Sequence, residues 1–287
     1  MSDAAVGVIG GSGVYQMQGL TVVDERRIET PFGEPSDAFV IGEVDGVRVA
    51  FLARHGGGHR VLPNEINYRA NIYGLKTLGV HTILSASAVG SMKEAYEPTD
   101  MVFPHQFIDR TRHRPDTFFG NGIVGHVAFA DPICAGAALM MSEAGREAGA
   151  RVHVGGVYIC IEGPQFSTRA ESNLYRSWGV DVIGMTNLTE ANLAREAEIC
   201  YVTMAMVTDY DCWHESGDVS VEQILAYLRA NASMAQTIIR KTIPRVAKRE
   251  RNCACANALQ FAIVTDPARI PAAVKKDLEP IIGRYIH

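Results

Sequence analysis

Short apolar runs rich in valine and isoleucine recur along the chain, separated by segments with helical periodicity. Near-continuous apolar runs of this length are typical of strands buried on both faces of a sheet. The runs lie at residues 6–9, 38–41, 47–53, 82–88, 101–103, 152–161, 181–185 and 199–207. With helices between them, they predict an α/β fold whose mixed, mainly parallel β-sheet is flanked by helices. Ligands then belong at the carboxyl ends of the strands.

Helical periodicity predicts helices at residues 64–79, 133–149, 167–178, 189–198 and 220–248. The last begins with Ser220 and has Gln223 three residues later, the spacing of a capping box. The apolar residues that share one face of this helix are Val221, Ile224, Leu225 and Leu228. Such a stripe is typical of a helix that packs against a core.

The composition favours one globular domain over residues 1–287. Apolar residues make up 47% of the chain, and no low-complexity linker or internal repeat divides it. The net charge of -5, with scattered basic residues, argues against nucleic acid or an anionic membrane as the main partner. Because no secretory signal or run of about 18 apolar residues is present, we expect a cytoplasmic protein.

The six cysteines do not have the density of a disulfide scaffold. Four of them lie singly among apolar neighbours, which is typical of ordinary buried thiols: Cys134, Cys160, Cys200 and Cys212. Cys253 and Cys255 form a Cys-x-Cys pair, in which a disulfide would close a small, strained ring. A metal site with these two thiols would need partners that the sequence does not identify, so we expect reduced thiols and no metal.

Two acids spaced by one residue, Asp209 and Asp211, follow the apolar run at 199–207. In an extended backbone, residues i and i+2 point to the same side, so both carboxyl groups can address one flat ligand edge. Adenine has such an edge: a protonated acid can donate to its N7, and an ionised acid can accept from its amine. A purine must be protonated as it leaves a sugar, so the pair indicates purine nucleoside cleavage. The alternative is a turn with two solvated acids.

The first predicted strand ends in Gly10-Gly11-Ser12-Gly13, whose backbone amides and hydroxyl can hold an anion. A dinucleotide-binding fingerprint read from Gly11 would need glycine at position 16, where the chain has Gln16. No Gly-Lys-Ser/Thr follows, so a nucleotide P-loop is excluded as well.

The third predicted strand runs into Arg54-His55-Gly56-Gly57-Gly58-His59. Arginine supplies a fork of donors suited to phosphate, the imidazole supplies another, and the glycines allow close backbone approach. A metal site from His55 and His59 would need a helix, which three glycines disfavour. The segment also resembles the oxyanion loop of esterases, but the chain has no Gly-x-Ser-x-Gly nucleophile elbow.

Two further strand ends carry small or hydroxyl-bearing residues. One is the segment 85–91, Ser-Ala-Ser-Ala-Val-Gly-Ser, and the other is Met185-Thr186. Each alone is readily explained as a strand-to-helix turn with a capping residue. Together with the two loops above, they offer enough donors to surround a free phosphate without a metal.

Longer segments of the chain closely resemble the methylthioadenosine phosphorylase branch of the trimeric purine nucleoside phosphorylases. The matching segments are 10–13, 30–33, 53–56, 106–111, 162–172, 185–186 and 205–213. The resemblance covers nearly the whole chain and is more specific than any single glycine loop. It implies a pentosyltransferase that cleaves 5'-methylthioadenosine with phosphate to adenine and 5-methylthioribose 1-phosphate, in purine and methionine salvage.

The resemblance also implies roles for individual residues. The implied phosphate contacts are Ser12, Arg54, His55, Ser87, Ala88 and Thr186. For the base, the resemblance implies Phe166 and Ser167 around the purine and Asp209 and Asp211 on its N7 and amine edge. For the sugar, it implies Met185 beneath the ribose and Val221 and Ile224 at the 5'-methylthio group. It also implies that a neighbouring subunit contributes His126. Inorganic phosphate is the implied co-substrate, no other cofactor is implied, and a homotrimer is the implied assembly.

Two other functions remain open. A phosphorylase for 6-oxopurine nucleosides would be expected to present Asn where this chain has Asp209, because an oxo group requires a donor. A non-catalytic nucleoside-binding module would bind the same ligand without releasing adenine. For the favoured reaction, Asp209 must be protonated near neutral pH, which requires burial and the neighbouring charge of Asp211.

Overall fold

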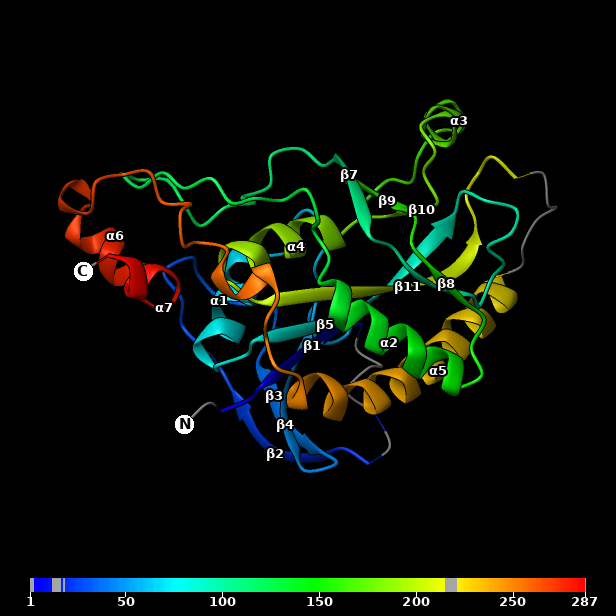
Figure 1. Cartoon of the computed structure of the whole chain (residues 1–287). Helices are drawn as coiled ribbons and strands as arrows, with labels where there is room; N and C mark the ends of the chain where they lie inside the picture. The colour runs from blue at the N-terminus through cyan, green and yellow to red at the C-terminus, as the bar shows by residue number, and fades with distance from the viewer. Residues whose placement is uncertain (1–2, 12–16, 18, 215–220, 287) are drawn as a thin grey trace.

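The computed structural model describes residues 3–11, 17, 19–214 and 221–286, with the backbone alone for 221–225. Within these residues, eleven strands form one mixed sheet (Figure 1). The strands are β1 (Val6–Gly10), β2 (Thr21–Arg26), β3 (Phe39–Val44), β4 (Val47–Ala53), β5 (Thr82–Ser91), β6 (Met101–Phe103), β7 (Gln106–Arg110), β8 (Val152–Val154), β9 (Val157–Ile161), β10 (Val182–Gly184) and β11 (Cys200–Tyr210).

The sheet branches at its long central strand, β5. The path β2-β3-β4-β1-β5-β10-β9-β7 runs across the sheet, while β11 pairs with β5 and β6, and β6 pairs with β8. Parallel pairs join β5 to β1 and β11, whereas β10 meets β5 in antiparallel orientation. The predicted α/β class with a mixed, mainly parallel sheet is confirmed.

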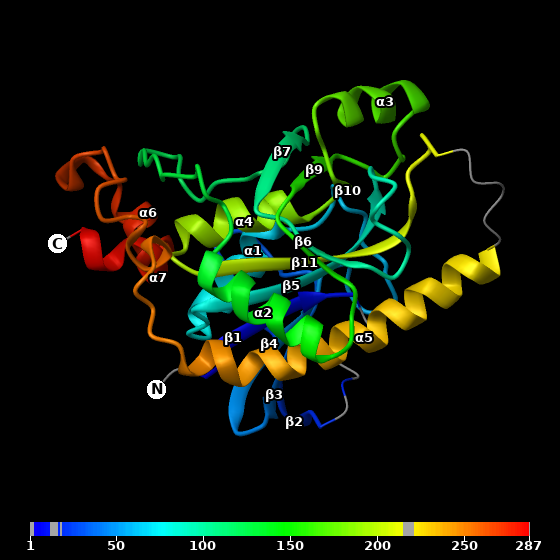
Figure 2. The same cartoon turned by 45° about the vertical axis from the view of Figure 1, so that its right-hand side comes forward.

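Helices cover the sheet on both sides. They are α1 (Tyr68–Thr77), α2 (Ala135–Glu147), α3 (Arg169–Ser177), α4 (Asn187–Glu196), α5 (Val221–Lys248), α6 (Ala272–Asp277) and α7 (Glu279–Ile282), with short 3-10 turns at Ala254–Asn257, Pro267–Arg269 and Gly283–Tyr285. In Figure 2 the sheet lies between the pair α2 and α5 and the pair α1 and α4. One apolar core runs from Ala4 to Ile282 and includes residues of both pairs. No helix in the described ranges is long and apolar enough to cross a bilayer.

Most strand predictions are confirmed, and the differences have local causes. The run at 152–161 is two strands, because Gly155 and Gly156 adopt φ values of 96° and 100° that break the extended backbone. Strand β2 was not predicted because it is an exposed edge strand with no apolar face. Strand β7 was also missed.

The predicted helices are confirmed, with two differences at their ends. The proposed capping residue Ser220 lies outside the described residues, whereas α3 begins with a capping box between Thr168 and Glu171 that was not predicted. Leu228 of α5, on the predicted apolar face, is 39% exposed, so this face is not fully buried at that position. The first turns of α5 extend beyond the sheet instead (Figure 2).

The prediction that Cys134 and Cys200 are isolated thiols is wrong. Their sulfur atoms lie with those of Cys253 and Cys255 in a cluster in which all four are within 4.8 Å of one another. Contacts between residues so far apart in the sequence follow from sheet topology and cannot be read from local patterns.

Candidate active site

An opening in the sheet lies beside the middle of β5. Strand β1 pairs with β5 as far as Ser85, and β10 begins to pair at Gly90, so neither covers this edge between them. Ala88 is accordingly exposed in a strand whose other residues are mostly buried. A backbone segment without a strand partner on one side can bind a ligand through its N–H groups.

A β-bulge in β11 sets the position of Asp209 opposite Gly90 of β5. Val207 pairs with Val89 and Asp209 with Gly90, so Thr208 is the extra residue. Asp211 lies just after the strand, where its backbone N–H donates to the carbonyl of Ser91 at 3.0 Å. The two acids therefore flank the same short stretch of β5.

The environment of Asp209 favours its neutral form. Burial raises the pKa of Asp209, and the nearby charge of Asp211 raises it further. The Thr208 hydroxyl opposes them by donating to Oδ1 of Asp209 at 2.5 Å, but the net shift of the pKa is upward. A carboxylic acid held neutral at a ligand opening can donate a hydrogen bond.

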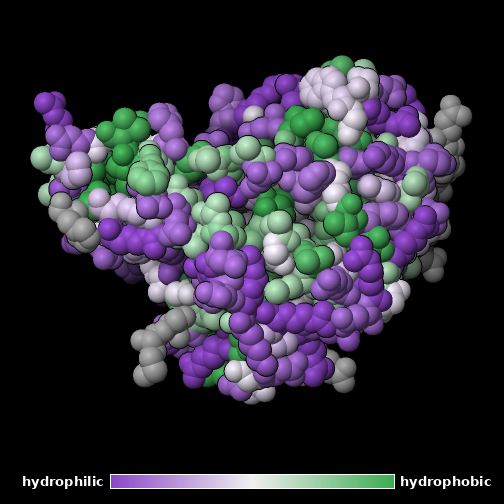
Figure 3. Space-filling view, in the orientation of Figure 1, coloured by the Kyte–Doolittle hydropathy of each residue, from purple (hydrophilic) through white to green (hydrophobic). Residues whose placement is uncertain are grey.

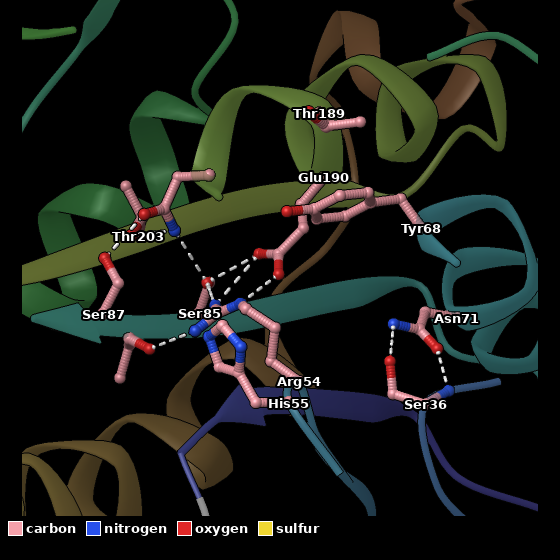
Figure 4. Close-up of polar contacts among 12 residues, drawn as sticks. Ser36, Arg54, His55, Tyr68, Asn71, Ser85, Ser87, Thr189, Glu190 and Thr203 are labelled. Atoms are coloured by element: carbon pink, nitrogen blue, oxygen red, sulfur yellow. Dashed lines mark hydrogen bonds and ion pairs between the residues drawn. The ribbon is translucent and has the colours of Figure 1, made fainter. Parts of the chain in front are cut away.

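Arg54 is buried beneath the opening in an ion pair with Glu190 of α4 (Figure 4). Its Nε donates to Oε1 of Glu190 at 2.5 Å and its Nη2 to Oε2 at 3.2 Å. Nη2 also donates to the Ser85 hydroxyl at 2.7 Å, and Nη1 to the carbonyl of Ala86 at 2.9 Å. Burial alone would lower the pKa of Arg54, but Glu190 raises it above its ordinary value. Since guanidinium has five N–H groups, one Nη1 hydrogen remains for a ligand.

A network of buried polar side chains connects this ion pair to Ser87. Tyr201 donates to Glu190 at 2.7 Å, and Asn187 donates to Tyr201 at 2.8 Å. The Ser87 hydroxyl donates to Oδ1 of Asn187 at 2.6 Å. Glu190, Asn187 and Tyr201 were not predicted, because no local sequence pattern marks them and their partners are separated from them in the sequence. Their mutual hydrogen bonds hold the donors below the opening in place.

The imidazole of His55 is neutral in this arrangement. Burial lowers its pKa to about 4, and the charge of Arg54 lowers it as well. Its Nδ1 lies 2.9 Å from the carbonyl of Val61 and therefore carries the ring hydrogen. The other ring nitrogen, Nε2, is then a hydrogen-bond acceptor and not the donor predicted from the sequence.

The N-terminus of α4 adds donors next to Ser87 and Arg54. Thr186 is buried at the N-cap, and its side chain makes no capping hydrogen bond. The first-turn N–H groups of a helix lack intrahelical partners and carry positive partial charge. This end of α4 is therefore suited to an anion.

The loop before α3 lies next to β10 and the end of β11. Gly163 has a φ of 67°, and a Cβ there would lie 2.6 Å from Sδ of Met185, so the loop packs directly on that side chain. The carbonyl of Ser167 accepts from the Cys212 thiol at 3.5 Å. Phe166 is 85% exposed, which leaves its ring available to a ligand or another chain.

Four of the residues implied by the resemblance are not brought to the opening by the described structure. Ser12 lies outside the described residues, and for Val221 and Ile224 only the backbone is described. His126 is exposed, and its N–H donates to the carbonyl of Ala262 at 2.9 Å. The segment 120–126 lies at the end of the molecule that carries α6, whereas β11 runs toward the opposite end (Figure 1).

A sequence model of the phosphorylase superfamily matches residues 5–244. The chain belongs to the phosphorylase superfamily.

Among the relatives, S-methyl-5'-thioadenosine phosphorylase of Geobacter sulfurreducens is 61% identical over 286 residues, which cover 99% of this chain and 100% of the relative. The enzyme of the same name from Koribacter versatilis is 58% identical, with 99% and 97% covered. A crystal structure of methylthioadenosine phosphorylase from an antarctic soil metagenomic library has a TM-score of 0.95 and 49% identity, and the match covers 98% of this chain and 99% of that one.

Proposed function

We propose that the chain catalyses phosphorolysis of 5'-methylthioadenosine to adenine and 5-methylthioribose 1-phosphate. The observation that carries the proposal is the pairing of half-buried Asp209 with Gly90 of β5, the strand whose Ala86 carbonyl accepts a hydrogen bond from Arg54. The near full-length similarity to enzymes named S-methyl-5'-thioadenosine phosphorylase supports it. Inorganic phosphate is the co-substrate, and no further cofactor enters the reaction.

Phosphate binds where the donors below β5 converge. The remaining Nη1 hydrogen of Arg54, the backbone at Ala88 and the hydroxyl and helix end at Thr186 donate to its oxygens. Ser12 contributes from the first glycine loop, and Ser87 by rotation of its hydroxyl away from Asn187. The neutral ring of His55 accepts the hydrogen of a monoprotonated phosphate. Held in this way, a phosphate oxygen faces C1' of the sugar.

Asp209 acts on the departing base. As the bond between C1' and N9 breaks, its electron pair moves into the purine, and the Asp209 proton passes to N7 while a phosphate oxygen forms the new bond to C1'. Asp211 accepts a hydrogen bond from the exocyclic amine. The carboxylate left on Asp209 regains a proton from solvent before the next turnover.

The sugar and its 5' group lie between β10 and the start of α5. We place Met185 under the ribose, Phe166 and Ser167 beside the purine, and Val221 and Ile224 around the methylthio group. An apolar pocket rejects a hydroxyl by only about a hundredfold. We therefore expect adenosine to be a slow substrate, in line with the Schistosoma mansoni relative of 34% identity, which is named adenosine/methylthioadenosine phosphorylase.

Comparison of base release from matched nucleosides tests the proposed specificity. With phosphate present, we expect kcat/KM for adenine release from methylthioadenosine to be at least about a hundredfold higher than kcat/KM for hypoxanthine release from methylthioinosine. The reason is that a 6-oxo group requires a hydrogen-bond donor. Asp211 is an acceptor, and the proton of Asp209 is already donated to N7. Asp209→Asn should reduce the ratio of the two kcat/KM values. Equal rates for the two nucleosides in the unaltered enzyme would contradict the assignment.

The pH profile of kcat/KM should show an alkaline limb from Asp209. Its pKa is raised, so the neutral form is present below that pKa, and activity falls as the pH rises through it. Thr208→Val removes the hydrogen bond that favours the carboxylate and should move this limb to higher pH. Thr237→Val, at an exposed site on α5, is the control and should leave the limb in place. A limb that does not move in Thr208→Val would exclude Asp209 as its source.

We also propose a homotrimer in which His126 reaches the site of a neighbouring subunit. Support comes from exposed apolar side chains next to its segment: Phe261 is 90% exposed, Val264 67% and Val124 49%. Apolar surface is visible at this end of the molecule in Figure 3. Such patches mark contacts between proteins. Light scattering after size exclusion should give three times the chain mass, and a monomer with full activity would overturn this arrangement.

A further inference from the structure

Four cysteine thiols from three separate segments converge on one point at the start of β11. We propose that Cys134, Cys200, Cys253 and Cys255 bind one structural zinc ion, tetrahedrally and through all four sulfur atoms. Their sulfur atoms lie within 4.8 Å of one another, and three of the four residues are buried. Four cysteine ligands without an open position are typical of structural rather than catalytic zinc.

The spacing of the sulfur atoms fits this geometry. Sγ of Cys253 lies 3.4 Å from Sγ of Cys200 and 3.9 Å from Sγ of Cys134. A tetrahedron with zinc–sulfur bonds of about 2.3 Å has sulfur–sulfur edges of about 3.8 Å. Small rotations of the side chains therefore suffice to place all four sulfur atoms around a central ion.

The backbone already fixes two of the three segments to each other. Cys134 immediately precedes α2, and its N–H donates to the carbonyl of Tyr201 at 2.9 Å, one residue beyond Cys200. Cys253 and Cys255 belong to the turn Ala254–Asn257 and its N-cap. Because the ligands come from a helix start, a strand start and a short turn, the site is largely formed before an ion binds.

Arg249 supplies the positive charge that a tetrathiolate site requires. Its Nη1 donates to Sγ of Cys134 at 3.2 Å. The Arg249 guanidinium occupies the space beside Gly136 that a side chain would otherwise fill. A Cβ atom at position 136 would lie only 2.5 Å from Cζ of Arg249. Each of the four thiols releases its proton to solvent on coordination.

The position of the cluster indicates a structural role. Cys200 begins β11 and Asp209 lies nine residues further along the same strand, which corresponds to about 30 Å of extended backbone. An ion there cannot contact the substrate. It instead connects the sheet to the turn Ala254–Asn257, from which the chain continues to α6 and α7. Cys253 is only half-buried and gives the ion a route of entry.

Titration with cobalt tests the site without any need for activity. Full-length protein, reduced and freed of metal by a chelator, is titrated with Co²⁺. We expect thiolate-to-cobalt charge-transfer bands and intense tetrahedral d–d bands that saturate at one ion per chain and disappear when Zn²⁺ is added. Protein purified without chelator should contain about one zinc per chain. Absence of these bands, or cysteines joined as disulfides in protein purified without oxidant, would overturn the proposal.

Variants separate the cluster from cysteine chemistry in general. The double substitution Cys253→Ala and Cys255→Ala should abolish the cobalt bands, and a chelator should lower the Tm of the unaltered protein but not of this variant. Cys160→Ala, at a buried thiol of β9 outside the cluster, is the control and should bind cobalt in full. Full cobalt bands in the double variant would show that these thiols are not the ligands.

Discussion

Replacement of Asp209 by Ala should lower kcat for adenine release by about a hundredfold or more, because the departing purine then leaves as an anion without a proton on N7. The proposed phosphate donors at Arg54, Ala88 and Thr186 belong to other elements and are unchanged. The KM for phosphate should therefore stay within a few-fold of its value in the unaltered enzyme. Initial rates at varied phosphate and saturating nucleoside measure both quantities.

Two further variants make this result specific. Asp209→Asn keeps a hydrogen-bond donor but has no proton to transfer, so it should retain more activity than Asp209→Ala while losing the alkaline limb of the pH profile. Asp24→Ala, at an exposed acid of β2 paired with Arg26, should have normal kcat. If Asp209→Ala and Asp24→Ala turn over equally fast, Asp209 is not the acid.

Replacement of Glu190 by Gln should destabilise the fold by about 3–5 kcal/mol, because it leaves the charge of Arg54 buried without its counter-ion. Both side chains are almost inaccessible, with exposures of 3% for Arg54 and 2% for Glu190. Glu190 also accepts hydrogen bonds from Ser85 and Tyr201, so one substitution disturbs the whole network below the proposed phosphate donors. Urea denaturation gives the loss in free energy of unfolding, and the KM for phosphate should rise in the same variant.

The chain offers a matched control in an exposed ion pair. Glu147→Gln breaks the contact of Glu147 with Arg245, which is also 2.5 Å long but lies on the surface. Solvent screens such pairs, so little change in stability is expected. Replacing both buried partners, Arg54→Met with Glu190→Leu, should recover part of the stability but no activity. Equal urea midpoints for Glu190→Gln and Glu147→Gln would contradict the account of this network.

The elements with strong periodicity could be predicted from the sequence, and those without it could not. Strand β11 and helix α2 bury long apolar stretches, so their patterns are clear. Strand β2 has no buried face, and the glycines at 155 and 156 divide an otherwise continuous apolar run. The hydrophobic pattern of a segment indicates which of its residues are buried. It does not reveal an exposed edge strand or a break in the backbone.

In the candidate site, too, residues close together in the sequence could be predicted as a pair, whereas residues far apart in the sequence could not. Asp209 and Asp211 are separated by one residue, so the sequence suggests them as a pair, whereas it gives no sign of the bulge at Thr208. Glu190 lies 136 residues from Arg54, and only the packing of α4 on the sheet reveals them as a pair. The cysteine cluster was missed for the same reason. The one sequence feature that could have pointed to Glu190 is its position as an acid in the first turn of a predicted helix.

The dependence of adenine release on phosphate tests the central claim most directly. Methylthioadenosine is incubated with the enzyme in phosphate-free buffer and with saturating phosphate, and adenine and the sugar product are both quantified. The account predicts one 5-methylthioribose 1-phosphate for each adenine, and no enzymatic release above background when phosphate is omitted. Adenine formed equally fast in phosphate-free buffer, with free methylthioribose as the product, would contradict it.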